Sequence, residues 1–533
     1  MRKNKKAFIN GNIFTVNERM KWAESIITSC GKIIFVGTNS QAQNFIDDDT
    51  EIIDLNGKLV LPGFIDSHAH LILGGFYLQG IDLSTAKSKT KFQNIFSDFI
   101  KNHKSGWIKG GNWNHQLFDK VELPTKEWID EITKGIPVFV HRMDYHMALA
   151  NSVALKQANI TAETSNPVGG TIEKDESGEP TGILKDKAMD LIYKILPTPT
   201  TDEYQNAIQL AMNEAEKFGI TSVHDISYKN HFAELQKFER EKKLTCRIYS
   251  ILPIELHKNI IKSEIICPFG NDKLKIGAMK AFADGSLGSS TAYFSEPYED
   301  DKSNYGLAME ILSSGKLSDW AFECDKHSLQ LVIHAIGDRA ISEVIDIYES
   351  INKVHGNRDR RMRIEHAQHM NKNDFQRLYN NNIIISAQPY HLYDDGPWAI
   401  NKIGNERLRT TYAFNSFLKN NIRLCFGSDW PVSTFNPIEG IYAAVIRQTS
   451  DGLNKNGLIS EEKISVEDAV KCYTINAAFA SFSEELVGSI ETGKFADFIV
   501  LDENIFTISS EAIRDVKVEM TIFNGEIIYS LKK

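Results

Sequence analysis

The sequence lacks the long apolar run that a membrane-spanning helix requires. No stretch of about 18 consecutive apolar residues occurs in its 533 residues. Residues 1–12 are basic and then polar, without the apolar region of a signal peptide. We therefore expect a cytoplasmic protein with no membrane partner.

Paired cysteines and an excess of positive charge are also missing. The six cysteines form no C-x-x-C pair, which indicates free thiols in a reducing compartment. A net charge of -10 argues against a nucleic-acid-binding surface. A Gly-rich phosphate loop, a Ser-His-Asp order and a dinucleotide fingerprint are absent as well. These absences argue against nucleic acids and nucleotides as ligands.

The two ends of the chain share one pattern, that of short strands joined by tight turns. Residues 7–57 and 496–529 contain apolar runs, with hairpin signals at Asn10-Gly11 and Asn524-Gly525. Neither end has enough strands for a domain of its own. We predict a composite β-sandwich formed by residues 1–58 and 485–533.

Between the ends, apolar runs alternate with helical patterns. The predicted strands are 59–66, 220–225, 245–252, 274–282, 329–334, 361–367, 382–388 and 422–427. Eight such strands are what a closed (β/α)8 TIM barrel of the α/β class requires. We assign residues 59–79 and 206–484 to this barrel, whose last predicted helix spans 466–482.

The gap after the first predicted barrel strand is far too long for one β/α unit. Residues 80–205 are therefore predicted to form an inserted α+β subdomain that acts as a substrate lid. The turn-rich stretch 166–182 within it is typical of a β-hairpin.

Chemically active side chains follow the predicted barrel strands. His68 and His70 lie two positions apart, so on a strand they project to the same side. They come at the carboxyl end of the strand, where barrels carry their chemistry. Later strands end at Lys280, His334, His366 and Asp429. Taken singly, each of these side chains is more often an ordinary core or surface residue, but together they are hard to attribute to packing.

Imidazole and carboxylate ligands bind Zn²⁺ or a similar divalent ion and leave a position open for water. The ion lowers the pKa of this water from about 15.7 towards 7. Asp429 is then predicted to take the proton of the water and to pass it to the leaving group. His366 is predicted to be a ligand, and either His366 or a nearby donor is predicted to help hold the oxyanion.

Lys280 is unusual among metal ligands, because an ammonium group repels a cation. Two interpretations remain open. Carbamylation by CO₂ would turn the amine into a carboxylate able to bridge two metal ions about 3.5–4 Å apart. Alternatively, Lys280 forms an ordinary ion pair with Asp284.

The order of these motifs resembles the amidohydrolase superfamily. The pattern begins with Pro62-Gly63-Phe64-Ile65-Asp66 before His68-x-His70, and ends with Gly427-Ser428-Asp429-Trp430-Pro431. Motifs at 284–289, 334–338 and 365–367 are most similar to the YtcJ-like branch, which includes the N-substituted formamide deformylases. This resemblance implies a bridging carboxylated Lys280 and zinc as the usual metal. The number of ions, one or two, is left open, and Fe or Mn in place of zinc is left open as well.

The predicted insert resembles the same branch at 111–114, 124–130 and 141–152. It departs from the branch at 112–114 and 144–146, where relatives carry Gly-Trp-Asp and Asp-Gly-His, and this puts the substrate in doubt. The candidate substrate-binding residues are Trp113, His146, His224, Gln388 and His391. His224 is expected to support a metal ligand rather than to bind the metal itself. Asp338 and Glu365 adjoin predicted ligands and are expected to orient imidazoles.

These features predict a metal-dependent hydrolase that cleaves a non-peptide, amide-type C–N bond of a small molecule. A deaminase and an ester or lactone hydrolase remain open, because fold does not fix function. A non-catalytic ligand-binding barrel, or a protein with a purely structural metal, is a further alternative. The expected partner is a small amide-like substrate, and a homodimer is left open.

Overall fold

The computed structural model describes residues 5–101, 103, 106–167 and 169–531. The chain divides into two compact units, one of residues 1–71 with 212–533 and one of residues 72–211. The predicted insert 80–205 lies inside the second unit, and the three-domain division remains our proposal. Residues 1–4, 532–533 and Val168, which the predicted sandwich and hairpin include, lie outside the described residues.

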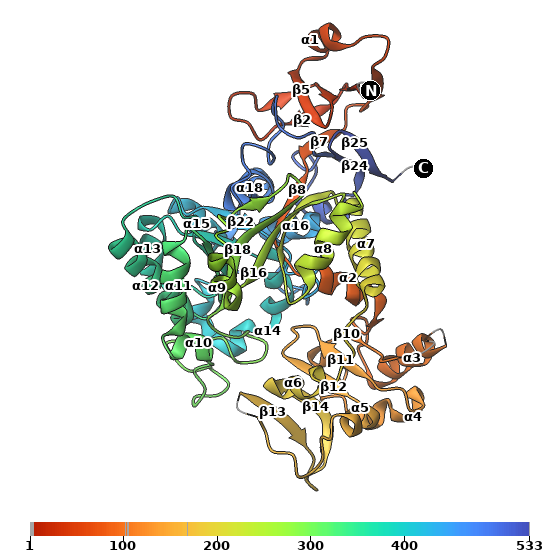
Figure 1. The fold of residues 1–533 in the computed structure, drawn as a ribbon, viewed down its shortest axis with the longest axis vertical. Helices are drawn as coiled ribbons and strands as arrows, with labels where there is room; N and C mark the ends of the chain where they lie inside the picture. Colours follow the sequence, from red (N-terminus) through yellow and green to blue (C-terminus); the bar gives the residue numbers. More distant parts are fainter. Residues whose placement is uncertain (1–4, 102, 104–105, 168, 532–533) are drawn as a thin grey trace. The chain divides into compact units, whose positions relative to one another are not determined.

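The first unit contains a nearly closed barrel of eight parallel strands (Figure 1). In chain order these are β8 (Phe64–Ala69), β15 (Ile220–Ile226), β16 (Arg247–Pro253), β18 (Leu274–Phe282), β19 (Gln330–Ala335), β20 (Arg363–His366), β21 (Ile384–Ala387) and β22 (Leu424–Phe426). At the seam between the last and first strands, the Asp429 N–H donates to the His68 carbonyl over 2.7 Å. The predicted (β/α)8 barrel is confirmed.

Helices follow the barrel strands in the sequence. They include α8 (His231–Arg240), α9 (His257–Lys262), α11 (Lys316–Lys326), α12 (Asp338–His355), α13 (Asp374–Asn380), α14 (Pro389–Leu408), α15 (Phe414–Lys419) and α16 (Pro437–Ile446). In α12, Ile341, Val344, Ile345 and Tyr348 are buried, and this spacing of three and four residues forms one apolar face. Among the described residues, no helix has the length and apolar character needed to cross a bilayer.

Two further sheets of the first unit bring the chain ends together. One has the order β5 (Lys32–Gly37), β4 (Ser25–Ser29), β1 (Lys5–Ile9), β6 (Glu51–Asp54). The other has the order β25 (Glu526–Ser530), β24 (Val518–Phe523), β23 (Phe498–Leu501), β7 (Leu59–Pro62), β2 (Asn12–Phe14), β3 (Trp22–Ala23). Because β7 pairs with both β2 and β23, one sheet contains strands from both ends of the chain (Figure 1).

The predicted strand 59–66 is wrong in one respect, because the structure divides it into β7 and β8. Gly63 separates the two strands. A Cβ atom at Gly63 would lie 2.2 Å from the Thr221 Oγ1 of β15, so only glycine allows the chain to pass here. The residues before it belong to the composite sheet and those after it to the barrel.

The predicted helix 466–482 is also two elements, α17 (Val466–Cys472) and α18 (Ile475–Ala480). Thr474 interrupts it with non-helical angles of φ -132° and ψ -101°. The preceding carbonyl, that of Tyr473, accepts a 2.7 Å hydrogen bond from the Ile65 N–H of β8. The carbonyl therefore serves the first barrel strand instead of continuing the helix.

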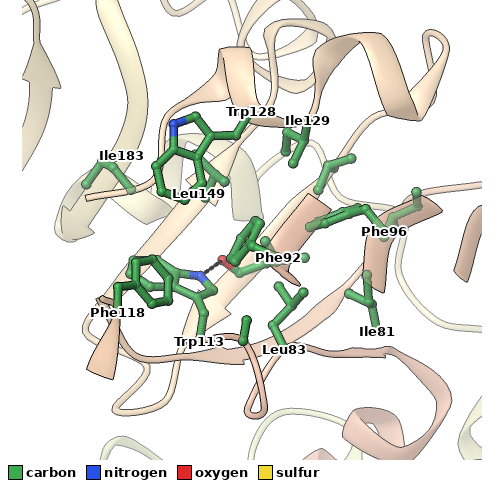
Figure 2. Close-up of a cluster of buried hydrophobic side chains, with 14 residues drawn as sticks. Ile81, Leu83, Phe92, Phe96, Trp113, Phe118, Trp128, Ile129, Leu149 and Ile183 are labelled. Carbon is green, nitrogen blue, oxygen red and sulfur yellow. Dashed lines mark hydrogen bonds between the residues drawn. The ribbon is translucent and has the colours of Figure 1, made fainter. Parts of the chain in front are cut away.

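The second unit is built on a six-stranded sheet of its own. Its order is β13 (Gly170–Lys174), β14 (Pro180–Asp186), β12 (Met147–Ala150), β11 (Phe139–Arg142), β10 (Gly110–Trp113), β9 (Ile81–Asp82). The predicted hairpin is confirmed by the antiparallel pairing of β13 with β14. An apolar cluster that includes Phe92 and Phe96 of α3 (Lys89–Ile100) forms part of the core of this unit (Figure 2).

Candidate metal centre

The ends of the first and last barrel strands place two imidazoles against one carboxylate. His70 Nε2 lies 3.0 Å and His68 Nε2 3.4 Å from Asp429 Oδ1. Ligand atoms of all three side chains lie within 4.8 Å of one another. The seam of the barrel thus brings together one group of predicted metal ligands.

A buried ion pair fixes the ring of His68. His68 Nδ1 is hydrogen-bonded to Glu365 Oε2, and Arg363 donates to both oxygens of Glu365 at 2.9 Å. Burial raises the pKa of Glu365, but Arg363 and His68 outweigh it and hold the pKa well below its ordinary value. Because an ionised Glu365 only accepts hydrogen bonds, the Nδ1 atom of His68 carries the hydrogen.

This hydrogen bond leaves a lone pair on the other ring nitrogen. Burial and the Lys280 charge lower the pKa of His68, so the ring is neutral at pH 7 and Nε2 is unprotonated. Nε2 faces an Asp429 oxygen 3.4 Å away. Two lone pairs directed at the same space favour a cation between them, which is the arrangement of a metal site.

Asp429 is held as a charged group in spite of its burial. Burial alone would raise its pKa, but the neighbouring imidazoles of His68 and His70 keep the pKa well below its ordinary value. Its backbone has a φ of 60°, a left-handed conformation that costs a non-glycine residue about 1–3 kcal/mol. His366 has a φ of 70°. Such conformations concentrate at functional sites.

A second group of close ligand atoms contains His366, His391 and, again, Asp429. The ring centroids of His366 and His68 are 4.9 Å apart, and the Nδ1 atom of His366 is buried without a hydrogen-bond partner. Burial and the neighbouring His334 lower the pKa of His366 well below its ordinary value. A neutral imidazole is the form that ligates metals.

His334 lies beside these groups without belonging to either of them. Its ring centroid is 4.5 Å from that of His366. Its Nε2 donates to the Gly285 carbonyl over 3.1 Å, so the ring is held by the loop that follows β18.

Lys280 is buried on β18, and its Nζ atom has no hydrogen-bond partner. Burial lowers its pKa to about 8, against the raising effect of Glu365 and Asp429. Asp284 instead accepts from the N–H groups of Tyr293, Ile336 and Gly337 at 2.8–3.0 Å. The structure therefore gives no support to the Lys280–Asp284 ion pair, and carbamylation remains a prediction.

The predicted substrate contacts fall into two sets. His224, Gln388 and His391 are buried in the first unit. Arg363 donates to His224 Nδ1 over 2.8 Å. This contact is consistent with a supporting role for His224 rather than metal binding. Gln388 donates to the Ser386 carbonyl and leaves Oε1 buried and unpaired.

Trp113 and His146 belong to the second unit. Trp113 is fully buried in the core of this unit, and its indole N–H donates to the Val140 carbonyl over 3.0 Å (Figure 2). This position is that of a packing residue and speaks against the predicted contact with substrate. His146 Nδ1 lies 2.9 Å from Asp186 Oδ1, which raises the pKa of His146 against the effect of burial. Its contact with substrate stays a prediction.

The sequence analysis missed several residues that support the site. Asp66 Oδ1 accepts from the N–H groups of His68 and Ser428 at 2.9 and 3.1 Å, and burial raises the pKa of Asp66 to about 7. The Tyr228 hydroxyl lies 3.2 Å from His70 Nδ1. Asp66 sits two positions before His68 in the same motif, a signal that could have identified it, whereas no local pattern points to Tyr228.

A cavity of about 480 Å³ lies away from this centre. It is lined by residues that immediately precede β20, β21 and β22, among them Arg361, Ile383 and Arg423. Arg361 there forms a 2.7 Å ion pair with Glu484. Since these residues lie at the amino ends of the strands, where barrels do not carry their chemistry, we place the site at the carboxyl ends.

Comparison with known proteins identifies the family of this chain. The model of the amidohydrolase family matches residues 51–529. The chain belongs to the amidohydrolase family. It is 40% identical, over 98% of its length and 91% of the relative's, to the protein LONG AFTER FAR-RED 3 of Arabidopsis thaliana.

Two further relatives confirm the resemblance to the YtcJ-like branch of the amidohydrolases. The chain is 31% identical to YtcJ of Bacillus subtilis strain 168, over 97% of this chain and 98% of the relative. It is 29% identical to the N-substituted formamide deformylase of Arthrobacter pascens, over 98% of this chain and 97% of the relative. Among solved structures, an uncharacterized metal-dependent hydrolase from Pyrococcus horikoshii OT3 matches with a TM-score of 0.80 and 29% identity, covering 95% of this chain and 99% of that one.

Proposed function

We propose that this amidohydrolase cleaves an amide-type C–N bond of a small molecule with Asp429 as general base. The observation that carries the proposal is the position of Asp429. Its buried, ionised carboxylate is shared by the His68–His70 group and the His366–His391 group. A base surrounded by imidazoles at the carboxyl end of a barrel suits hydrolysis of a polar bond.

The residues proposed to hold the metal are His68, His70, Lys280, His334, His366 and Asp429, with Lys280 as its carbamate. The donor set supports this, because the unprotonated His68 Nε2 and the Asp429 carboxylate face one another. Nitrogen and carboxylate ligands suit Zn²⁺, and this set of six residues has room for one or two ions. When bound, the ion supplies Lewis-acid polarisation and a more acidic water.

The protein's own residues then move and hold protons. Asp429 takes one proton from the attacking water and delivers it to the nitrogen that leaves, so that an acid and an amine form. His68 stays neutral because burial lowers its pKa, and its single ring hydrogen lies on Nδ1, towards Glu365. Arg363 keeps Glu365 ionised throughout. The name of the Arthrobacter pascens relative, a formamide deformylase, supports the choice of an amide-type bond.

A substrate panel tests the proposed bond. The zinc-loaded protein is offered N-formyl amines, N-acyl amino acids, cyclic ureas and lactones, and product release is followed by mass spectrometry. We expect turnover of at least one amide-type compound. Turnover of lactones alone would favour the ester-type alternative, and ammonia released from an amino-substituted ring would favour a deaminase.

Replacement of Asp429 by asparagine tests the base. Asp429→Asn keeps the shape of the side chain but cannot take a proton, so we expect the rate to fall by about 10²–10⁴-fold. Metal content is measured by elemental analysis at saturating zinc, so that loss of the base is separated from loss of the ion. Asp359→Asn, at the opposite end of the barrel, serves as the matched control. A variant that retains its metal and hydrolyses at nearly the original rate contradicts the proposal.

A further inference from the structure

Gln368 and His391 form a contact beside the metal centre that the proposed chemistry does not yet use. Gln368 lies two residues beyond β20, and His391 lies in the first turn of α14, just after β21. The Gln368 amide nitrogen is 3.2 Å from His391 Nδ1. Both side chains are buried.

The direction of this hydrogen bond fixes the state of the imidazole. The Gln368 amide nitrogen only donates, so the His391 Nδ1 atom it contacts must be an unprotonated acceptor. The single hydrogen of the neutral ring therefore lies on Nε2. A nitrogen that carries a hydrogen has no lone pair for a metal ion.

The Nε2 atom of His391 is directed towards the proposed base. It is buried without a hydrogen-bond partner and lies 3.8 Å from Asp429 Oδ2. That distance is too long for a hydrogen bond, so the donor is uncommitted. The ring of His391 lies nearly parallel to that of His366, at 9° and 6.1 Å between centroids.

We propose that His391 donates its Nε2 hydrogen to the oxygen of the scissile carbonyl, and that Gln368 positions it for this by fixing its tautomer. The inference rests on the proposed function and adds a residue to it. As water attacks, negative charge develops on the carbonyl oxygen beside Asp429. A buried, oriented donor stabilises this charge without having to reorganise. His391 is thus a catalytic donor and not a metal ligand.

Two substitutions of His391 separate these roles. His391→Leu removes the donor, and we expect kcat to fall by about 10²–10³-fold, the cost of one oxyanion donor. His391→Gln places an amide N–H near the position of Nε2 and should recover a substantial part of the rate. If both variants keep wild-type activity, or if the glutamine variant is as inactive as the leucine variant, the assignment is wrong.

Metal affinity gives a readout that does not depend on turnover. Zinc affinity is measured by competition with a chelator for the wild type, His391→Leu and His70→Ala. We expect His391→Leu to stay within twofold of the wild type, whereas His70→Ala binds zinc at least tenfold more weakly. A tenfold loss in His391→Leu would show that His391 is a ligand and would overturn the inference.

The positioning role of Gln368 is tested by coupling to His391. Gln368→Met cannot donate, so we expect kcat to fall about tenfold while KM and zinc affinity hold. In the His391→Leu background the same change should have no further effect on kcat, because Gln368 acts only through the ring. If Gln368→Met lowered kcat further in the His391→Leu background, this positioning role would be contradicted.

A tetrahedral probe keeps this inference separate from the proposed function. An N-alkyl methylphosphonamidate, whose anionic oxygens mimic the attacked amide, should bind the zinc-loaded wild type at least tenfold more tightly than His391→Leu. A wild type that cleaves no compound of the panel contradicts the proposed function alone. Equal binding of the probe by both proteins contradicts the donor assignment alone.

Discussion

At the scale of single residues, the centre depends on side chains that do not touch the proposed metal. Glu365 fixes the tautomer of His68, and Arg363 in turn holds both oxygens of Glu365. All three side chains are almost completely buried. Partners of this kind orient a ligand and raise its basicity. The chain Arg363–Glu365–His68 is therefore as much a part of the site as the ligands are.

Substitution of Glu365 should weaken the centre without removing a ligand. In Glu365→Gln the amide can present its N–H to His68 Nδ1 and shift the hydrogen to Nε2. We expect zinc affinity to fall by about 10–100-fold, as measured by chelator competition. Glu484→Gln, which breaks the Arg361 ion pair at the other end of the barrel, is the control. An unchanged zinc affinity in Glu365→Gln would show that Glu365 does not support the metal centre.

The strand-end residues could be predicted because each follows an apolar run in a simple local pattern. The structure confirms that His68, His70, His366 and Asp429 lie close together, while their roles stay predictions. Glu365 contacts an imidazole as expected, but Asp338 instead accepts from the Ser295 N–H over 2.7 Å. Gln368 and Arg363 could not be identified, because their partners His391 and His224 lie 23 and 139 positions away and leave no local pattern. Trp113 matched a motif, and the structure places it fully buried in an apolar cluster, which the motif alone did not indicate.

At the scale of elements, the seam between β22 and β8 holds the site together. Asp66 of β8 accepts from the Ser428 N–H just beyond β22, and the His68 carbonyl accepts from the Asp429 N–H. Gly427 lies between these contacts. A Cβ atom there would lie 2.5 Å from the His68 nitrogen and 2.8 Å from Asp66 Oδ1. The two strands approach closely only because Gly427 has no side chain.

A single methyl group at the seam should therefore disturb both stability and metal binding. In Gly427→Ala the strands must separate, at a cost of about 1–3 kcal/mol, and the atoms of His68 and Asp429 move apart. We expect a lower melting temperature and weaker zinc binding. Gly452→Ala, whose added Cβ has nothing within 4 Å, should lower stability slightly and leave zinc affinity alone. If Gly427→Ala and Gly452→Ala had equal effects on zinc affinity, the seam would not set the geometry of the site.

The order of elements was predictable, whereas their breaks were not. Apolar runs and turn residues mark each barrel strand, so all eight predicted strands have counterparts in the sheet. The division into β7 and β8 depends on Thr221 packing against Gly63. The break before α18 depends on the Ile65 N–H reaching the Tyr473 carbonyl. Both causes are contacts between residues far apart in the chain, and local periodicity does not encode them.

At the scale of the first unit, one ion pair connects the barrel to the composite sheet. Arg247, at the start of β16, donates to both oxygens of Asp497 at 2.7 and 3.2 Å, just before β23. The guanidinium also stacks on the Phe495 ring at 3.7 Å. Both charged groups are nearly inaccessible to water. Such a pair is costly to break, because the remaining charge stays buried.

Removal of one partner should destabilise the whole unit. Asp497→Asn leaves the Arg247 charge uncompensated, and we expect a loss of about 3–5 kcal/mol in the free energy of unfolding. Thermal unfolding followed by circular dichroism measures the effect as a lower transition temperature. The control Asp98→Asn breaks the exposed pair with Lys101, which is worth about 1 kcal/mol at most. Equal transition temperatures for the two variants would refute a connecting role.

The distance in sequence between His70 and Asp429, 359 positions, has a consequence during synthesis. While the ribosome is still making the later strands, the early histidines have no carboxylate to complete their group. With the proposed ligand set, we expect the emerging polypeptide to acquire its ion only after β22 has been translated and has docked beside β8. Cotranslationally released fragments that end before residue 429 should leave the ribosome metal-free.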